Sequence, residues 1–92
     1  MDYVLIIHAV KDYVEWKKVF DGAASLRKNA GEQSYVLRDE NDANKVVHFS
    51  KWSSIADAKA FFESAELVEI RRQAGVEAPE FNYLNMLEQG TL

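Results

Sequence analysis

The sequence predicts an α+β domain of the ferredoxin-like split β-α-β type. Its elements follow the order strand, helix, strand, strand, helix, strand (βαββαβ), which short connections and right-handed crossovers turn into a four-stranded antiparallel sheet with the helices on one face. The first and third strands, about 2–10 and 45–52, should lie in the centre, and both carry apolar residues on their two faces. Helices can cover only one face, so we expect a second copy of the chain to cover the other.

The first half begins with a strand over about 2–10, in which residues alternate between two faces. Asp12 and Glu15 then have the spacing of a capping box, which predicts the start of a helix. Gly22 should weaken this helix without stopping it, and Gly31 should end it in a left-handed conformation. Its buried stripe follows the helical spacing: Tyr13, Trp16, Phe20, Ala23, Ala24 and Arg27.

A hairpin should follow. The alternation over 33–39 predicts a second strand, and the polar run 40–44 has the composition of a turn into the strand over 45–52. Ser54 and Asp57 form a second capping box, which opens a helix. The expected inward residues of that helix are Ile55, Ala58, Phe61 and Phe62.

The end of the chain carries signals for one more helical segment and one more strand. Ser64 should restart a helical segment, which Gly75 closes. Pro79 should precede the last strand, over roughly 80–88. We find no internal repeat, linker or low-complexity stretch along the sequence.

The two central strands have different faces. One face is purely apolar, with Leu5 and Ile7 on the first strand and Val47 and Phe49 on the third, and we assign it to the helices. The other face mixes polar and apolar residues, and a homodimer formed through it would bury its apolar part. If the assignment is shifted by one residue, the two sets of residues exchange faces, and both faces of the sheet still carry apolar residues. The surface expected in the dimer consists of Val4, Ile6, Val10, Val46 and Trp52.

Composition limits the classes of function. The 92 residues make one domain, 1–92, with 48% hydrophobic residues, a net charge of −4 and a pI near 5.1. The charge is spread along the chain, which argues against nucleic acid as a partner. The absence of cysteine excludes disulfides and thiolate sites. No apolar run approaches the roughly 18 residues of a membrane span, so we expect no membrane partner and a cytoplasmic location.

Four residues on the mixed face could carry chemistry: His8, His48, Ser50 and Trp52. In the expected arrangement this face is turned away from the helices. Histidine titrates near neutral pH, so His8 or His48 could act as a catalytic base that takes a proton from a phenol or an enol. Trp52 would then be a stacking wall for a planar substrate, and Ser50 would orient it.

Each of these residues also has a purely structural interpretation. A histidine on a strand is commonly part of a hydrogen-bonded core, and Trp52 could serve only in packing. Arg38 could contact a ligand at the mouth of the barrel, although a solvated arginine is the simpler alternative, and Arg71 with Arg72 forms a basic helix end with a possible anion-binding role. With two histidines in the chain and no carboxylate on their face, we expect no metal site.

Over nearly its whole length the chain resembles the dimeric α/β barrel superfamily, and within it the domains similar to antibiotic biosynthesis monooxygenases (ABM). The resemblance is carried by the element order and by the runs Tyr3–Val10, Asp12–Trp16 and His48–Ser54, the last leading into Ala58–Phe62. It implies a homodimer whose sheets face one another. It also implies a cofactor-independent monooxygenase, or a related cyclase or isomerase, that acts on a small aromatic or enolic metabolite. The haem-degrading branch has a histidine late in its second helix, where this chain reads Glu69-Ile70-Arg71-Arg72, which argues against haem degradation.

Two functions therefore remain open. The first is a cofactor-independent monooxygenase-like enzyme, with a small aromatic-lined pocket between sheet and helices. The second is a non-catalytic homodimer that binds a small metabolite or serves as an assembly unit. A solvent-accessible cavity of a few hundred Å³ beside the histidines would favour the enzyme.

Overall fold

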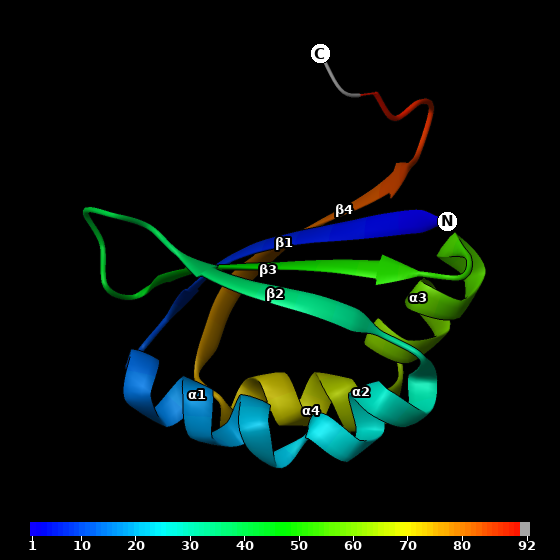
Figure 1. The fold of residues 1–92 in the computed structure, drawn as a ribbon. Coiled ribbons are helices and arrows are strands. Elements are labelled where there is room, and N and C mark those ends of the chain that lie inside the picture. Colours follow the sequence, from blue (N-terminus) through cyan, green and yellow to red (C-terminus); the bar gives the residue numbers. More distant parts are fainter. Residues whose placement is uncertain (91–92) are drawn as a thin grey trace.

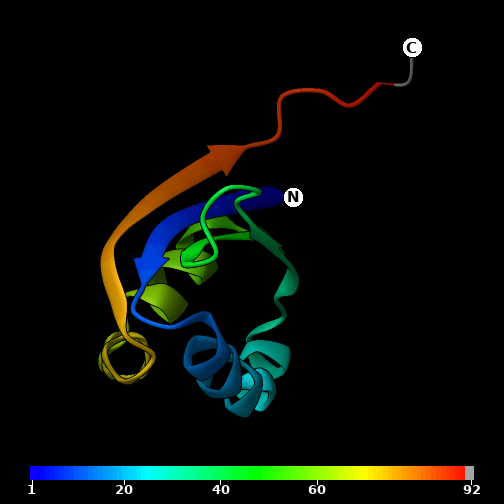
Figure 2. The ribbon, with the colours of Figure 1, turned by 90° about the vertical axis from the view of Figure 1, so that its left-hand side faces the viewer.

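The computed structural model describes residues 1–90, and it confirms the predicted fold class (Figure 1). The four strands form one antiparallel sheet in the order β2-β3-β1-β4, so the first and third strands are central. The helices lie together on one side of this curved sheet (Figure 2). The elements are β1 (Asp2–Val10), α1 (Tyr13–Gly22), α2 (Ala24–Ala30), β2 (Gln33–Arg38), β3 (Lys45–Trp52), α3 (Ile55–Phe62), α4 (Ala65–Gln73) and β4 (Val76–Asn85).

Three of the helices start where the sequence signals them. The side chain of Asp12 accepts a hydrogen bond from the backbone N–H of Glu15 at the start of α1. The hydroxyl oxygens of Ser54 and Ser64 do the same at the starts of α3 and α4. Each bond satisfies one of the backbone donors that a first helical turn leaves free.

The single first helix that was predicted is in fact two. Ala23, directly after Gly22, has φ −96° and ψ 11° and separates α1 from α2. Glycine is a poor helix former, and here it weakens the helix enough for the chain to turn. Gly31 ends α2 in the left-handed conformation, as expected.

The last strand begins at Val76, earlier than the predicted start near residue 80. Its pairing with β1 shifts register between Ile7 and Ala9, which is the mark of a β-bulge. Ala78, with a φ of 41°, and Pro79 lie in this bulge. Because β4 is an edge strand with an irregular ladder at this point, it tolerates a proline inside its length.

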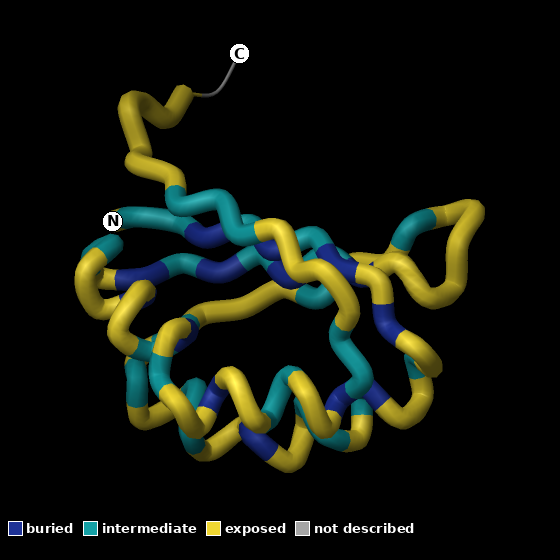
Figure 3. Tube along the Cα trace, turned by 180° about the vertical axis from the view of Figure 1, so that it is seen from behind, coloured by how far each residue is buried: buried dark blue, intermediate teal, exposed yellow. Residues whose placement is uncertain are grey.

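The assignment of the two sheet faces was wrong, and the alternative that exchanges them is correct. Val4, Ile6, Val46 and Trp52 are buried, and they pack against α3 and the other helices rather than forming a bare surface. Buried positions therefore recur along the central strands, alternating with positions that are partly open (Figure 3). The mixed face can face the helices because its polar side chains find partners there, as described below.

The outer face of the sheet has an apolar centre, with Lys45, Lys51, Glu80 and Asn82 on the same face around it. Phe49 stacks on Tyr3 and Tyr35, with ring centroids 5.3 and 6.3 Å apart. Tyr35 and Leu37 are 63% and 52% exposed. All the helices in Figure 1 lie on the other side of the sheet, so none of them covers this face. We call this surface the outer face, and its apolar residues are Tyr3, Leu5, Ile7, Tyr35, Leu37, Val47, Phe49 and Leu84.

Val46→Asp and Val47→Asp form a matched pair that tests the face assignment. Val46 is fully buried, so an aspartate there should lower the free energy of unfolding by at least about 4 kcal/mol, a large part of the stability of a small domain. Val47→Asp should still unfold cooperatively, because its side chain lies on the outer face. Urea denaturation followed by circular dichroism measures both, and equal stability of the two variants would contradict the assignment.

Candidate functional site

A cavity of about 60 Å³ lies between the sheet and the helices. Its wall is mostly aromatic and aliphatic. Four polar side chains interrupt this wall: His8 from β1, His48 from β3, Arg27 from α2 and Arg71 from α4. The apolar lining consists of Ile6, Trp16, Val19, Phe20, Ala23, Phe61, Phe62, Leu67, Ile70, Ala74 and Val76.

His48 is held by a buried carboxylate. Its Nε2 lies 2.7 Å from Oε1 of Glu32, whose side chain has no exposed area. The same oxygen lies 3.8 Å from Nε of Arg27. Nη1 of Arg27 donates to the carbonyl of Phe20 at 2.6 Å, and its guanidinium lies 3.5 Å from the centre of the Phe20 ring. Arg27, Glu32 and His48 thus form one network, in which Oε2 of Glu32 is buried without a hydrogen-bond partner among the described residues.

His8 is buried without a hydrogen-bond partner. Only 5% of the residue is exposed, and neither ring nitrogen has a partner among the described residues. The pKa of His8 is lowered from 6.5 to about 4, mostly by burial and also by the nearby His48 and Arg71. Its ring lies 5.6 Å from that of Trp16. His8 is therefore neutral at pH 7, with one donor and one acceptor available.

Arg71 presents one free edge to the same cavity. Its Nη2 donates to the carbonyl of Phe62, the last residue of α3, at 2.8 Å, while Nη1 is buried without a partner. The guanidinium also lies 5.0 Å from the centre of the Phe81 ring. Burial lowers the pKa of Arg71, and Tyr83 acts in the opposite direction. No carboxylate within residues 1–90 forms an ion pair with Arg71.

The structure brings the two predicted histidines together. His48 pairs with Ile6 and His8 with Val46, so the histidines are diagonal neighbours on adjacent strands. They face the helices, however, and not the side of the sheet turned away from them. The physical reason is that Glu32 and the two arginines, which come from the helical connections, supply polar surroundings on the inner face.

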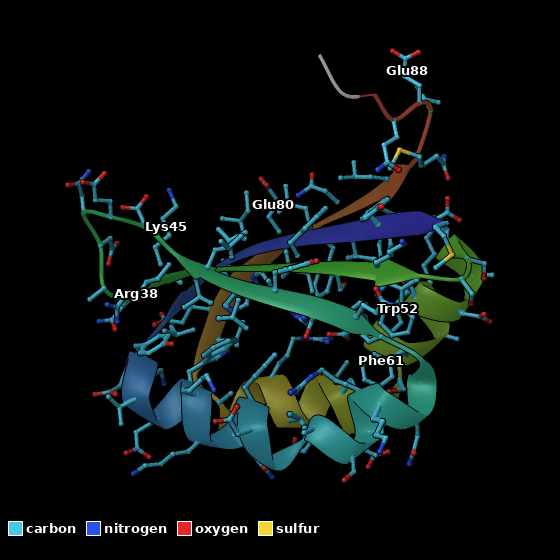
Figure 4. The ribbon with its side chains drawn as sticks, viewed as in Figure 1. Arg38, Lys45, Trp52, Phe61, Glu80 and Glu88 are labelled. Atoms are coloured by element: carbon cyan, nitrogen blue, oxygen red, sulfur yellow. The ribbon has the colours of Figure 1, made fainter. Side chains whose placement is uncertain are left out.

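Ser50 and Trp52 are on the inner face but do not line the cavity. Nε1 of Trp52 donates to the hydroxyl of Ser50 at 2.9 Å, and both side chains are fully buried. Figure 4 shows Trp52 and Phe61 close together on the helix side of the sheet, and their ring centroids are 5.3 Å apart. In this arrangement Phe61 and Phe62, which Trp52 supports, form the aromatic wall of the cavity.

Arg38 lies away from the cavity, near the hairpin end of β2 (Figure 4). It is exposed, and its guanidinium lies 4.7 Å from the centre of the Tyr13 ring. This contact corresponds to the simpler interpretation of Arg38 as a surface residue.

Sequence reasoning missed Arg27, Glu32 and Trp16 as parts of the site. Arg27 and Trp16 lie on the predicted inward stripe of the first helix, and a charged residue on such a stripe was the available signal. Glu32 gave no signal, since it follows the helix and its partner His48 belongs to another element. Within residues 1–90, no three His, Asp or Glu side chains lie close enough to hold a metal ion.

Comparison with solved structures gives the same fold throughout. A proposed antibiotic biosynthesis monooxygenase from Nitrosomonas europaea is 17% identical, with a TM-score of 0.75, and the match covers 96% of this chain and 100% of that one. SnoaB, a cofactor-independent oxygenase from Streptomyces nogalater, is 12% identical, with a TM-score of 0.75 and coverage of 96% and 93%. A proposed monooxygenase of the same kind from Deinococcus radiodurans is 9% identical, with a TM-score of 0.78 and coverage of 100% and 98%.

These likenesses confirm the resemblance at the level of the fold, which is that of the ABM domains. No protein-family model matches the sequence, and the comparison with curated proteins gives no match. No helix within residues 1–90 is long and apolar enough to cross a membrane.

The buried His8 predicts a pH-dependent stability. Its pKa of about 4 in the folded protein lies below its value of 6.5 in the unfolded chain, so the unfolded chain binds the extra proton as the pH falls between these values. The free energy of unfolding should therefore fall by about 2–3 kcal/mol from pH 6.5 to 4, after allowance for solvent screening.

His8→Gln removes this contribution while leaving the carboxylates, which also titrate in this range. The measurement is urea denaturation at several pH values, and the difference between wild type and variant isolates His8. Parallel stability curves for the two proteins would contradict the depressed pKa.

Proposed function

We propose that this chain, which has the ABM fold, is a cofactor-independent, monooxygenase-like enzyme for a small enolic or aromatic metabolite. The observation that supports this proposal best is the paired arrangement of His48 with Glu32 at the wall of an apolar cavity that also holds His8 and Arg71. The base would be His48, and His8 and Arg71 would bind the oxygen of the substrate. Phe61 and Phe62, rather than Trp52 directly, would enclose its carbon skeleton.

The Glu32 contact suits His48 to the role of base. Since Nε2 faces a carboxylate, it carries the hydrogen, and Nδ1 is left to accept a proton. A buried carboxylate also stabilises the imidazolium that forms when histidine accepts a proton, and it fixes the orientation of the ring. This is the arrangement that general-base catalysis requires.

Arg71 and His8 are placed to stabilise the negative charge that develops on the substrate when its proton is removed. Removal of a proton from an activated CH₂ group leaves negative charge on the neighbouring oxygen, which the free Nη1 of Arg71 could stabilise. The carbanion then reduces O₂: one oxygen atom becomes a new carbonyl on that carbon, and the other leaves as water with the two hydrogens of the CH₂ group. Substrate and O₂ balance this reaction without an external reductant.

The size of the cavity favours the second candidate, a non-catalytic binding module. At about 60 Å³ it is far smaller than the few hundred Å³ expected for an enzyme that acts on a large aromatic substrate. We therefore restrict the proposed substrate to small molecules. The binding module remains the alternative if none of them is turned over.

The homodimer is part of the proposal, and the outer face would form it. This face carries three aromatic rings and five aliphatic side chains with no helix over them, whereas a monomer rarely exposes a contiguous apolar patch of more than a few hundred Å². Two such faces, packed about 10 Å apart, would bury each other in an isologous dimer. We also propose that residues 1–92 form a single domain.

Oxygen consumption with acetylacetone, which has an activated CH₂ group, tests the catalytic proposal. Uptake above the uncatalysed rate should fall by at least about 100-fold in His48→Gln, because that is the usual contribution of a general base. Glu32→Gln should also slow it, whereas Glu40→Gln in the exposed hairpin turn should not. Unchanged uptake in His48→Gln would exclude that residue as the base, and no uptake with acetylacetone would favour the binding module.

Phe49→Asp tests the dimer. The ring lies at the centre of the aromatic cluster on the outer face, so a charge there should convert dimers to monomers at micromolar concentration in multi-angle light scattering. Lys28→Asp, on the exposed side of α2, is the matched control and should leave the dimer intact. A wild-type protein that is monomeric at high concentration would refute the pairing.

A further inference from the structure

The two halves of the chain end their second helices with the same short pattern, so the expectation of no internal repeat is wrong. Arg27-Lys28-Asn29-Ala30-Gly31-Glu32 corresponds to Arg71-Arg72-Gln73-Ala74-Gly75-Val76. Gly31 and Gly75 have φ values of 84° and 74°, so both segments leave their helices in the left-handed conformation. The repeat is thus one of backbone conformation as well as of sequence.

The arginines of the repeat also make equivalent contacts. Arg27 donates to the carbonyl of Phe20 near the end of α1, and Arg71 donates to the carbonyl of Phe62 at the end of α3. Both guanidinium groups line the cavity. Each half also sends one histidine into the cavity, His8 from β1 and His48 from β3, so the site contains two similar sets of an arginine and a histidine.

The sets differ at the last position of the repeat. In one set, Oε1 of Glu32 lies 2.7 Å from Nε2 of His48 and 3.8 Å from Nε of Arg27. In the other set, the equivalent residue is Val76, which lines the cavity and offers no carboxylate. Among residues 1–90, both ring nitrogens of His8 and Nη1 of Arg71 are left without partners, whereas the first set leaves only Oε2 of Glu32 without one.

The charges around the cavity also indicate an anionic partner. Two arginines and the carboxylate of Glu32 leave one positive charge around the cavity when both histidines are neutral. No acidic residue lines the cavity among residues 1–90. A buried charge without a counterion is costly, so the site favours a ligand with one negative charge.

We infer that the cavity binds a small organic monoanion whose carboxylate lies between Arg71 and His8, in the place that Glu32 occupies between Arg27 and His48. This inference names the substrate class of the site and rests on the proposed function for its location. The cavity volume is about 60 Å³, and a water molecule needs about 10–15 Å³ of it. The cavity therefore has room for roughly four to six water-sized groups. A short oxo acid, which also forms an enol, combines this size with the required charge.

The experiment is a titration of the full chain with pyruvate, followed by ¹H–¹⁵N correlation spectra. Methyl pyruvate, which lacks the charge, is the matched ligand control. Pyruvate should give saturable shifts of amides in β1 and α4, and methyl pyruvate should not.

Two variants test the contact itself. Arg71→Gln should weaken pyruvate binding at least about tenfold, since hydrogen bonds to charged groups are among the stronger ones in proteins. Val76→Glu supplies the carboxylate that the second set lacks, so it should abolish pyruvate binding. Val68→Glu makes the same substitution at an exposed position of α4 and should leave binding unchanged. If Val76→Glu fails to fold, Arg71→Gln decides the question.

Several outcomes would overturn the inference. These are equal shifts with methyl pyruvate, unchanged pyruvate affinity in Arg71→Gln, or unchanged affinity in a folded Val76→Glu variant. The absence of saturable shifts up to tens of millimolar pyruvate would show that the cavity holds water only, which also refutes it.

The two proposals can fail separately. Saturable pyruvate binding without exchange of its methyl protons, and without oxygen uptake from acetylacetone, would leave the anion site standing and refute the catalytic function. Oxygen uptake from acetylacetone by a protein that does not bind pyruvate would refute the anion site and leave catalysis standing.

Discussion

The burial of polar side chains between sheet and helices is the constraint on which the other features of this protein depend. A buried polar group without a partner costs about 1–3 kcal/mol, so nearly all such groups in native proteins are paired. Ser50 accepts a hydrogen bond from Trp52, and His48 contacts Glu32. Within residues 1–90 the exceptions are His8, one edge of Arg71 and Oε2 of Glu32, and the first two face the cavity. The region where a ligand would stabilise the protein most is therefore also the region with the chemically reactive groups.

The same constraint explains why the mixed face of the sheet is the inner one. An apolar strand face carries no information about what covers it, whereas histidine and serine can be buried only where neighbouring elements supply partners. The helical connections supply them through Arg27, Glu32 and Arg71. The apolar residues of the outer face have no such requirement, and in the proposed dimer a second copy of the chain would cover them.

The two halves of the domain place an arginine and a histidine around the cavity in similar ways, and they differ at the last position of the repeat. Where the first half carries Glu32, the second carries Val76, and this one position separates a histidine with a fixed partner from a histidine without one. In the proposed function, His48 moves a proton while His8 and Arg71 hold the negative charge. The repeat thus gives two similar sets of residues different roles.

The order of the elements and the starts of three helices could be predicted from the sequence, because a capping side chain and the amide that it binds are only three residues apart. The alternation in the sequence also showed that the sheet has two apolar faces. Which face the helices cover was decided only by the tertiary structure, since a period of two is the same for either assignment. The pairing of Glu32 with His48, and the shared cavity of His8 and Arg71, likewise join residues from different elements. No local pattern records such contacts, and only the packing of helices on the sheet brings these side chains together.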